Sequence, residues 1–253
     1  MNTTIRAALT TCAVIAAAPA LSQPPSAPQT ISKEQLAARF PELDIGGIKD
    51  SPVPGLYEAV SGTNVAYFTT DGRFLFRGDI VEIDSRTNLT DARRAESRAA
   101  MLATIDPAKE IVYAPPSGEI KHRIFVFTDV DCGYCRQFHR QIADVNALGI
   151  EVHYVSYPRT GPNTASWTRA ENVWCSADRK TALTEAKLGK ATDAVASCKD
   201  APIAEQYELG RRMGLTGTPG VYSESGVDLG GYVPAAQLLE RLDKLTARAA
   251  QKP

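Results

Sequence analysis

The chain has 253 residues and a formal net charge of -1. Because no block of five or six like charges occurs, the sequence lacks the basic surface that binding to nucleic acid or to an anionic membrane requires. No stretch of the chain reaches the roughly 18 consecutive apolar residues that a membrane-spanning helix needs. These features predict a globular chain whose partner is neither nucleic acid nor lipid.

Residues 1–20 predict a cleavable signal peptide. A single positive charge, Arg6, precedes the small and apolar run Ala7–Ala18, and the sequence Ala18-Pro19-Ala20 suits a signal peptidase that cleaves before Leu21. The apolar run is too short to span a bilayer. We therefore expect an exported protein that is not embedded in a membrane.

A mobile leader and a small first domain are predicted next. Residues 21–30 are rich in proline and serine, which is typical of a flexible segment. Ser32 and Gln35 then form a capping box, which predicts a short helix ending near Phe40. This helix opens a first domain that we place at residues 31–85.

Short strands punctuated by glycine and proline fill the rest of this domain. Asp71-Gly72 separates two such strands and predicts a tight hairpin, because the turn that closes it needs positive φ angles. Apolar residues lie on both faces of the strand before the turn: Ala66 and Phe68 on one, Val65 and Tyr67 on the other. So small a domain buries two apolar faces poorly, which predicts a self-association surface. The alternative is that the following linker and second domain cover the second face.

A linker helix is predicted over residues 86–106. Apolar residues recur every three or four positions from Leu89 to Ile105, with charged residues between them. Asp106-Pro107 ends the helix, since proline disfavours helical geometry in the residue before it. A second domain then occupies residues 107–253.

The second domain reads as an α/β unit with a mixed sheet. Its predicted elements are a strand (120–128), a helix (132–147), a strand (150–157), helical segments (167–214), a turn at Thr218-Pro219, two short strands and a final helix (234–250).

Thiol chemistry is predicted where the first of these strands runs into Cys132-Gly133-Tyr134-Cys135. Two cysteines three apart lie on one face of a helix, and unpaired backbone N–H groups at its N-terminus favour a thiolate at Cys132. Cys135, one turn further in, is expected to be more buried and able to attack a mixed disulfide at Cys132. The alternatives for such a pair are half of a zinc site or a static disulfide.

Four cysteines remain once Cys12, inside the signal peptide, is set aside, and four allow three pairings. The simplest joins Cys132 to Cys135 and leaves Cys175 and Cys198 to close a loop, which stabilises a fold by roughly 3.5 kcal/mol on the chain-entropy model. A four-cysteine zinc site would need a second closely spaced pair. We therefore expect a structural disulfide and neither metal nor cofactor.

The segments FTDVDCGYCRQFH, NALGIEVHYVSYPR and LGRRMGLTGTPG resemble, in this order, the periplasmic disulfide isomerases of the DsbC type and, more loosely, their DsbG-type relatives. The resemblance covers most of the mature chain. It implies a thioredoxin-like catalytic domain with a helical insertion, carried on a small α+β dimerisation domain in a V-shaped homodimer.

The resemblance also implies roles for individual residues. Cys132 resembles the attacking cysteine and Cys135 its partner, and Cys175 with Cys198 resembles the structural disulfide. Pro219 resembles a cis-proline that faces the active site, and Thr218 before it would present its backbone to a substrate peptide. The implied partners are misoxidised client proteins and a DsbD-type membrane electron donor.

Two departures from the family pattern carry expectations of their own. Asp131, together with Asp129, places negative charge near the thiol and should raise the pKa of Cys132. Gly220 follows the proline where a larger residue is expected, which could loosen the substrate loop.

Protein disulfide isomerase is the leading function on these grounds. A DsbG-like reductase of oxidised single cysteines shares the same motif and is the nearest alternative; an oxidase also shares it. A redox-independent holdase chaperone would instead depend on the apolar surface around Phe68, Phe74 and Phe76.

Other polar and aromatic residues receive plain interpretations. No catalytic role is assigned to His122, His139 or His153, and His139 is expected at the surface. Trp167, Trp174, Tyr154 and Tyr157 are expected in the core. Tyr134 is the exception, because between the two cysteines it has little core to join and is expected to contact clients.

Overall fold

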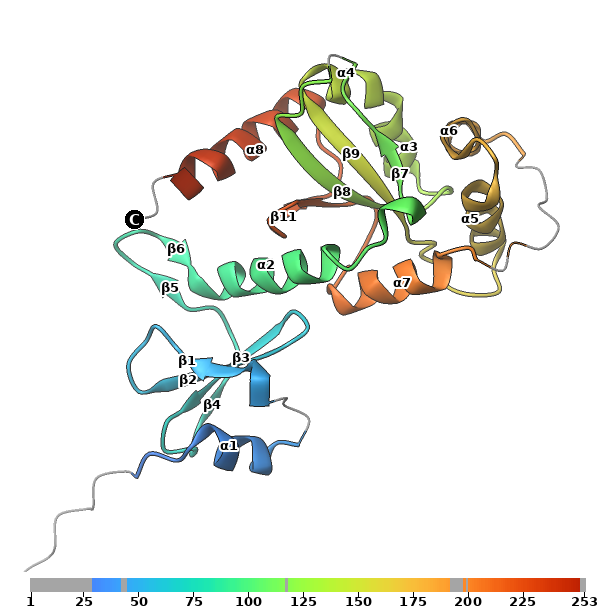
Figure 1. The fold of residues 1–253 in the computed structure, drawn as a ribbon. Helices are drawn as coiled ribbons and strands as arrows, with labels where there is room; N and C mark the ends of the chain where they lie inside the picture. Colours follow the sequence, from blue (N-terminus) through green and yellow to red (C-terminus); the bar gives the residue numbers. More distant parts are fainter. Residues whose placement is uncertain (1–28, 42–44, 117, 192–197, 199, 251–253) are drawn as a thin grey trace, which may run out of the picture.

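The computed structural model describes residues 29–41, 45–116, 118–191, 198 and 200–250 (Figure 1). The predicted signal peptide and most of the predicted leader lie outside these residues. The described chain forms a small N-terminal unit and a larger C-terminal unit, with a long helix between them (Figure 1).

The N-terminal unit packs one helix against an antiparallel sheet. Ser32 and Gln35 cap the helix α1 (Lys33–Arg39) reciprocally, as the capping box predicts. The other elements are η1 (Ile45–Gly47), β1 (Ile48–Asp50), β2 (Leu56–Ser61), β3 (Asn64–Thr69) and β4 (Leu75–Phe76), and the strand order is β1-β2-β3-β4. The predicted hairpin turn joins β3 to β4, and Gly72 adopts the positive φ that it needs.

Both faces of β3 are covered in this unit. Phe68 is buried with Leu36 of α1, so the expectation that Phe68 belongs to an exposed surface is wrong. Tyr67, on the opposite face, is also buried, and its hydroxyl lies 2.7 Å from Thr90 Oγ1 of the following helix. The linker helix therefore covers the second face of β3, as the alternative interpretation of the sequence expects.

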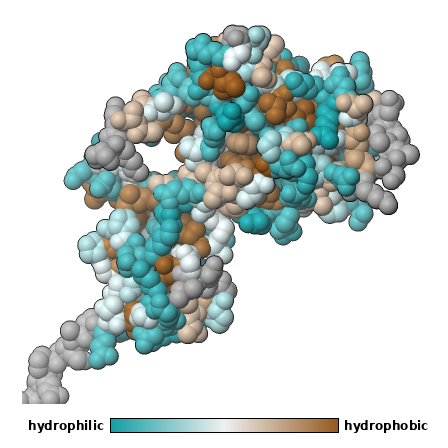
Figure 2. Space-filling model, viewed as in Figure 1, coloured by the Kyte–Doolittle hydropathy of each residue, from teal (hydrophilic) through white to brown (hydrophobic). Residues whose placement is uncertain are grey.

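Apolar exposure in this unit lies further along the chain. Phe74 and Phe76 are 54% and 51% exposed, and Figure 2 shows brown patches among the hydrophilic surface of the unit. Val81 and Ile83 extend the exposed apolar set into the small hairpin of β5 (Val81–Glu82) and β6 (Thr87–Asn88).

Helix α2 (Leu89–Leu102) contacts both units and is three residues shorter than the apolar spacing predicts. Near its start, Arg93 Nε donates to Glu58 Oε1 of β2 at 2.5 Å. Its last turn places Met101 and Leu102 in the core of the C-terminal unit. No helix within the described ranges is both long and apolar enough to cross a membrane.

The C-terminal unit is built on a mixed sheet of order β11-β10-β8-β9-β7, in which only β8 and β9 are parallel. This confirms the predicted thioredoxin-like α/β class. The short helix η2 (Pro107–Lys109) precedes the strands β7 (Ile111–Tyr113), β8 (His122–Thr128), β9 (Ile150–Ser156), β10 (Gly220–Ser223) and β11 (Asp228–Gly230).

Helices cover both faces of this sheet, and successive side chains of β8 point alternately into the two cores. Val126 points into one core and Phe127 into the other, because successive side chains of a strand face opposite sides. The second core is closed by α2 and α7. The remaining helices of the unit are α3 (Gly133–Arg140), α4 (Ile142–Ala147), α5 (Ala165–Cys175), α6 (Arg179–Lys187), α7 (Ile203–Arg212) and α8 (Ala235–Ala250).

The helix predicted over residues 132–147 is divided into α3 and α4 at Gln141. The Gln141 backbone leaves helical geometry there, with φ -103° and ψ 19°, and its side chain accepts a hydrogen bond from the Ala235 N–H at 3.0 Å and donates to the Val233 carbonyl at 3.4 Å. Gln141 thus ties the junction of the two helices to the start of α8.

Candidate active site

Cys132 lies where β8 has ended and α3 begins. It is the N-cap residue of α3, and its sulfur accepts a hydrogen bond from the Cys135 N–H at 3.4 Å. Unpaired N–H groups and the positive end of the helix dipole gather at this position. The local sequence therefore places Cys132 where a negative charge is favoured.

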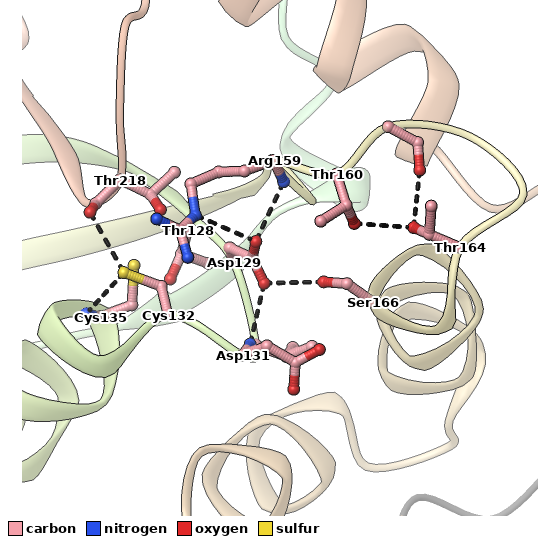
Figure 3. A network of polar contacts seen from close by, with 12 residues as sticks. Thr128, Asp129, Asp131, Cys132, Cys135, Arg159, Thr160, Thr164, Ser166 and Thr218 are labelled. Carbon is pink, nitrogen blue, oxygen red and sulfur yellow. Dashed lines mark hydrogen bonds and ion pairs between the residues drawn. The ribbon is translucent and has the colours of Figure 1, made fainter.

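Sheet pairing brings the second part of the site to the same point. β10 pairs antiparallel with β8, with Gly220 opposite Phe127, so the residues before β10 lie beside those that follow β8. The Thr218-Pro219 peptide bond is cis, and Cys132 Sγ lies 3.2 Å from the Thr218 carbonyl oxygen, to which it donates when it is protonated (Figure 3). Cys132, Thr218 and Pro219 are therefore neighbours although 86 residues separate the first two.

The surroundings of Cys132 favour its ionised form. Its pKa is lowered to about 5, chiefly by hydrogen bonding with the Cys135 side chain, while burial acts in the opposite direction. Thr218, the Cys135 N–H and the positive charge of Arg159 lower it further. Near neutral pH the residue is therefore a thiolate, the reactive form in thiol–disulfide exchange.

Cys135 is the opposite member of the pair. Both cysteines are buried, with Cys132 2% and Cys135 1% exposed, and both are free thiols in the structure. Burial raises the pKa of the Cys135 thiol far above its usual range, and hydrogen bonding with Cys132 adds to the rise. The pair thus combines one ionised sulfur with one protonated sulfur.

The pKa of Cys132 is lowered overall although Asp129 and Asp131 lie near it in the sequence. Asp131 pairs with Arg136 at 3.3 Å and also with Arg169. Asp129 accepts from the Arg159 N–H at 3.0 Å and from its guanidinium at 3.3 Å (Figure 3). Each carboxylate is therefore matched by positive charge.

Asp129 itself stays ionised although it is buried. Burial would raise the pKa of this carboxyl, but hydrogen bonds from the Asp131 N–H, the Ser166 hydroxyl and Arg159 outweigh it and hold the pKa below its usual value. The carboxylate thereby fixes the loop between β8 and α3 against the loop after β9.

Comparison with known proteins agrees with this geometry. Residues 109–246 match the thioredoxin-like domain family, and residues 16–91 match the disulfide bond isomerase protein N-terminal domain. The thiol:disulfide interchange protein DsbC of Dickeya dadantii is 36% identical over 203 residues, which cover 79% of this chain and 82% of the relative. The chain belongs to the DsbC family.

DsbC of Escherichia coli is similar at 35% identity over 199 residues, covering 78% of this chain and 80% of the relative. Among solved structures, a disulfide interchange protein from Neisseria gonorrhoeae superposes with a TM-score of 0.49 at 29% identity, covering 55% of this chain and 97% of that chain.

Two further residues of this DsbC-family site border the cysteines. Tyr134 is 65% exposed and stacks on Tyr232, with ring centroids 6.4 Å apart. Gly220 is buried, and a Cβ atom there would lie 2.1 Å from Leu215 Cδ1. The glycine thus permits Leu215 to pack closely beside the cis-proline.

The other two cysteines lie in the helical insertion. A disulfide joins Cys175, the last residue of α5, to Cys198, with the Cα atoms 5.9 Å apart. In the part of the chain that the structure describes, no group of three or more histidine, cysteine, aspartate or glutamate side chains could hold a metal ion.

The expectation that His139 is exposed is wrong. It is buried on α3, where its ring nitrogens lie 3.0 Å from the hydroxyl oxygens of Tyr154 and Thr184. Burial, with the charge of Lys187, lowers the pKa of His139 to about 4, so it is neutral near pH 7. His122 and His153 pair with carboxylates away from the cysteines.

Sequence reasoning missed three polar residues of the site: Arg159, Thr128 and Lys187. Thr128 and Arg159 lie within segments that carry the family resemblance, but the ion pair of Arg159 with Asp129 becomes visible only when β8 and β9 are placed side by side. Lys187 looks like an ordinary helical lysine in the sequence, yet it is 4% exposed.

Proposed function

We propose that this protein is an exported disulfide isomerase and reductase in which Cys132 is the nucleophile and Cys135 the resolving cysteine. The observation that carries the proposal is the pairing of a thiolate at Cys132 with a protonated, buried thiol at Cys135, next to the Thr218 backbone. No bound cofactor is needed for exchange between thiols and disulfides.

The first step is attack of the Cys132 thiolate on one sulfur of a non-native client disulfide. A bond forms between Cys132 Sγ and that sulfur, the client S–S bond breaks, and the other client sulfur leaves as a thiolate. The half-buried Thr218 backbone beside Cys132 supports binding of an extended client segment, and the exposed Tyr134 supports contact with apolar client residues.

Two outcomes follow from the mixed disulfide. If another client thiolate attacks the client sulfur, a new client disulfide forms and Cys132 leaves as a thiolate, so the enzyme isomerises without net oxidation. If Cys135 attacks Cys132 instead, the Cys132–Cys135 disulfide forms and the client receives two electrons. The second outcome leaves the enzyme oxidised, so an electron donor must reduce it, for which we propose a DsbD-type membrane protein.

The same proposal places the protein in the periplasm as a homodimer. The predicted signal peptide at residues 1–20 supports export. The exposed apolar side chains Phe74, Leu75 and Phe76 support association of two N-terminal units, since exposed patches of this kind mark interaction surfaces. We also propose the domain limits: a dimerisation domain at residues 31–85, a linker helix at 86–106 and a catalytic domain at 107–253.

The test is recovery of activity by a scrambled client with several disulfides in a glutathione buffer. We expect recovery with the reduced protein and none with Cys132→Ser, while Cys135→Ser should accumulate covalent client adducts. Normal turnover by Cys132→Ser would refute the proposal. Suppression of client aggregation by a variant that lacks both cysteines, without recovery by the native protein, would favour the holdase alternative.

A further inference from the structure

The amino group of Lys187 lies beside the loop that carries the two active-site cysteines, and the proposed exchange reaction gives it no role. It lies at the last residue of α6 and is buried, which lysine rarely is unless it is paired. Nζ donates to Thr128 Oγ1 at 2.7 Å and to the Asp129 carbonyl oxygen at 2.7 Å. Within the described residues, no carboxylate lies within ion-pair distance of it.

Thr128 stands between this amino group and the resolving thiol. It is the last residue of β8 and is 2% exposed. Figure 3 shows it among the side chains that surround the two sulfur atoms. Burial raises the pKa of the Cys135 thiol, and the charge of Lys187 and the Thr128 side chain both lower it.

Burial affects Lys187 and Cys135 in complementary ways. It lowers the pKa of Lys187 to about 8, so a neutral amine is accessible close to neutral pH. It disfavours the Cys135 thiolate, which must nevertheless form when Cys135 attacks Cys132. The neutral amine of Lys187, which contacts the Thr128 hydroxyl, is a buried base that can take up the proton of the Cys135 thiol. Six titratable or charged groups act on the pair: Cys132, Asp129, Arg136, His139, Tyr154 and Arg159.

We propose that Lys187, acting through the Thr128 hydroxyl, takes up the proton that Cys135 loses when it resolves the mixed disulfide. This inference rests on the resolving role of Cys135 in the proposed function. Lys187 is a positioning residue in this scheme, because it reaches the reacting sulfur only through Thr128.

The step balances as follows. The Thr128 hydroxyl accepts the thiol proton of Cys135 and passes its own proton to the neutral amine. The Cys135 thiolate then attacks Cys132 Sγ, a bond forms between the two sulfurs, and the bond from Cys132 to the client breaks. The client sulfur leaves with the electron pair as a thiolate. The ammonium that results makes the two donor contacts that the structure shows.

The experiment mixes purified, reduced protein with stoichiometric dithiobis(nitrobenzoate), which releases one coloured thiolate when Cys132 attacks and a second when Cys135 resolves the adduct. Both phases are followed by rapid mixing across a pH series. Lys187→Met and Thr128→Val remove the base and the hydroxyl respectively with little change in volume. Lys190→Met, on an exposed lysine close by, is the matched control.

We expect the second phase to slow about tenfold or more in Lys187→Met and in Thr128→Val, as is typical when acid–base assistance is lost. Its pH midpoint should move upward, whereas the first phase and the Lys190→Met variant should keep the native profile. A first phase with the native rate and pH profile, which the lowered pKa of Cys132 sets, shows that the site is folded in each variant.

An unchanged second phase would overturn the relay. So would a slower second phase with the native pH midpoint, because that result indicates a structural role only. A native protein that releases no coloured thiolate at all would instead refute the nucleophilic role of Cys132, and the relay would fall with it.

Discussion

Ionisation of Cys132 should make the reduced protein more stable as the pH rises from about 5 to about 7. Its pKa falls from 9.0 to about 5 on folding, so the folded protein holds a thiolate in this range while the unfolded chain holds a thiol. A group whose pKa is depressed on folding contributes stability that is full above the unfolded pKa and lost as the pH falls through the folded pKa.

The size of this effect follows from the two pKa values. Each pH unit between them adds about 1.4 kcal/mol to the free energy of unfolding, and the folded thiol is about half ionised at the start of the interval. The expected gain from Cys132 over the interval is therefore roughly 2 kcal/mol.

Urea unfolding of the reduced protein and of Cys132→Ser, at both pH values and at one protein concentration, measures it. Contributions from other groups cancel in the comparison between the two proteins. The native protein should gain roughly 2 kcal/mol more than the variant. If both proteins gained the same stability, the assignment of a thiolate to Cys132 would be refuted.

Two other parts of the molecule allow similar tests. Replacing Cys175 and Cys198 with alanine should lower the free energy of unfolding by roughly 3.5 kcal/mol, and an unchanged midpoint in urea would contradict a stabilising role. Phe76→Asp should convert the proposed dimer into a monomer in sedimentation experiments, because a charge would enter an apolar interface. Leu188→Asp, on a leucine of the C-terminal unit that is 62% exposed against 51% for Phe76, should leave the dimer intact. A dimeric Phe76→Asp protein would show that β4 is not part of the interface.

The catalytic pair could be predicted from the sequence because its signal is local. Two cysteines at the start of a helix are defined by their spacing alone. Helix geometry places His139 four residues after Cys135 on the same face, so its burial was also predictable. Exposure was expected because histidine is polar, but its position on the buried face of α3 decides its burial.

The remaining site residues were not predictable because they depend on contacts distant in sequence. Thr128, Arg159 and Lys187 come from three segments that only the pairing of β8 with β9 and the packing of α6 bring together. Charge near the thiol was equally hard to judge. Asp131 lies next to Cys132 in the sequence, but Arg169 of α5 compensates its charge in space.

The contacts of α2 limit how far the active site can move relative to the N-terminal unit. The helix is held at one end by Tyr67 and Glu58 and at the other by the second core. In its middle, Gly226 packs so closely on the Ala95 backbone that a Cβ atom would lie 2.0 Å from the carbonyl oxygen. A swinging arm would need at least one of these contacts to break. The helix, about 21 Å long, therefore acts as a fixed spacer that limits how far Cys132 can travel from the N-terminal unit to meet a client.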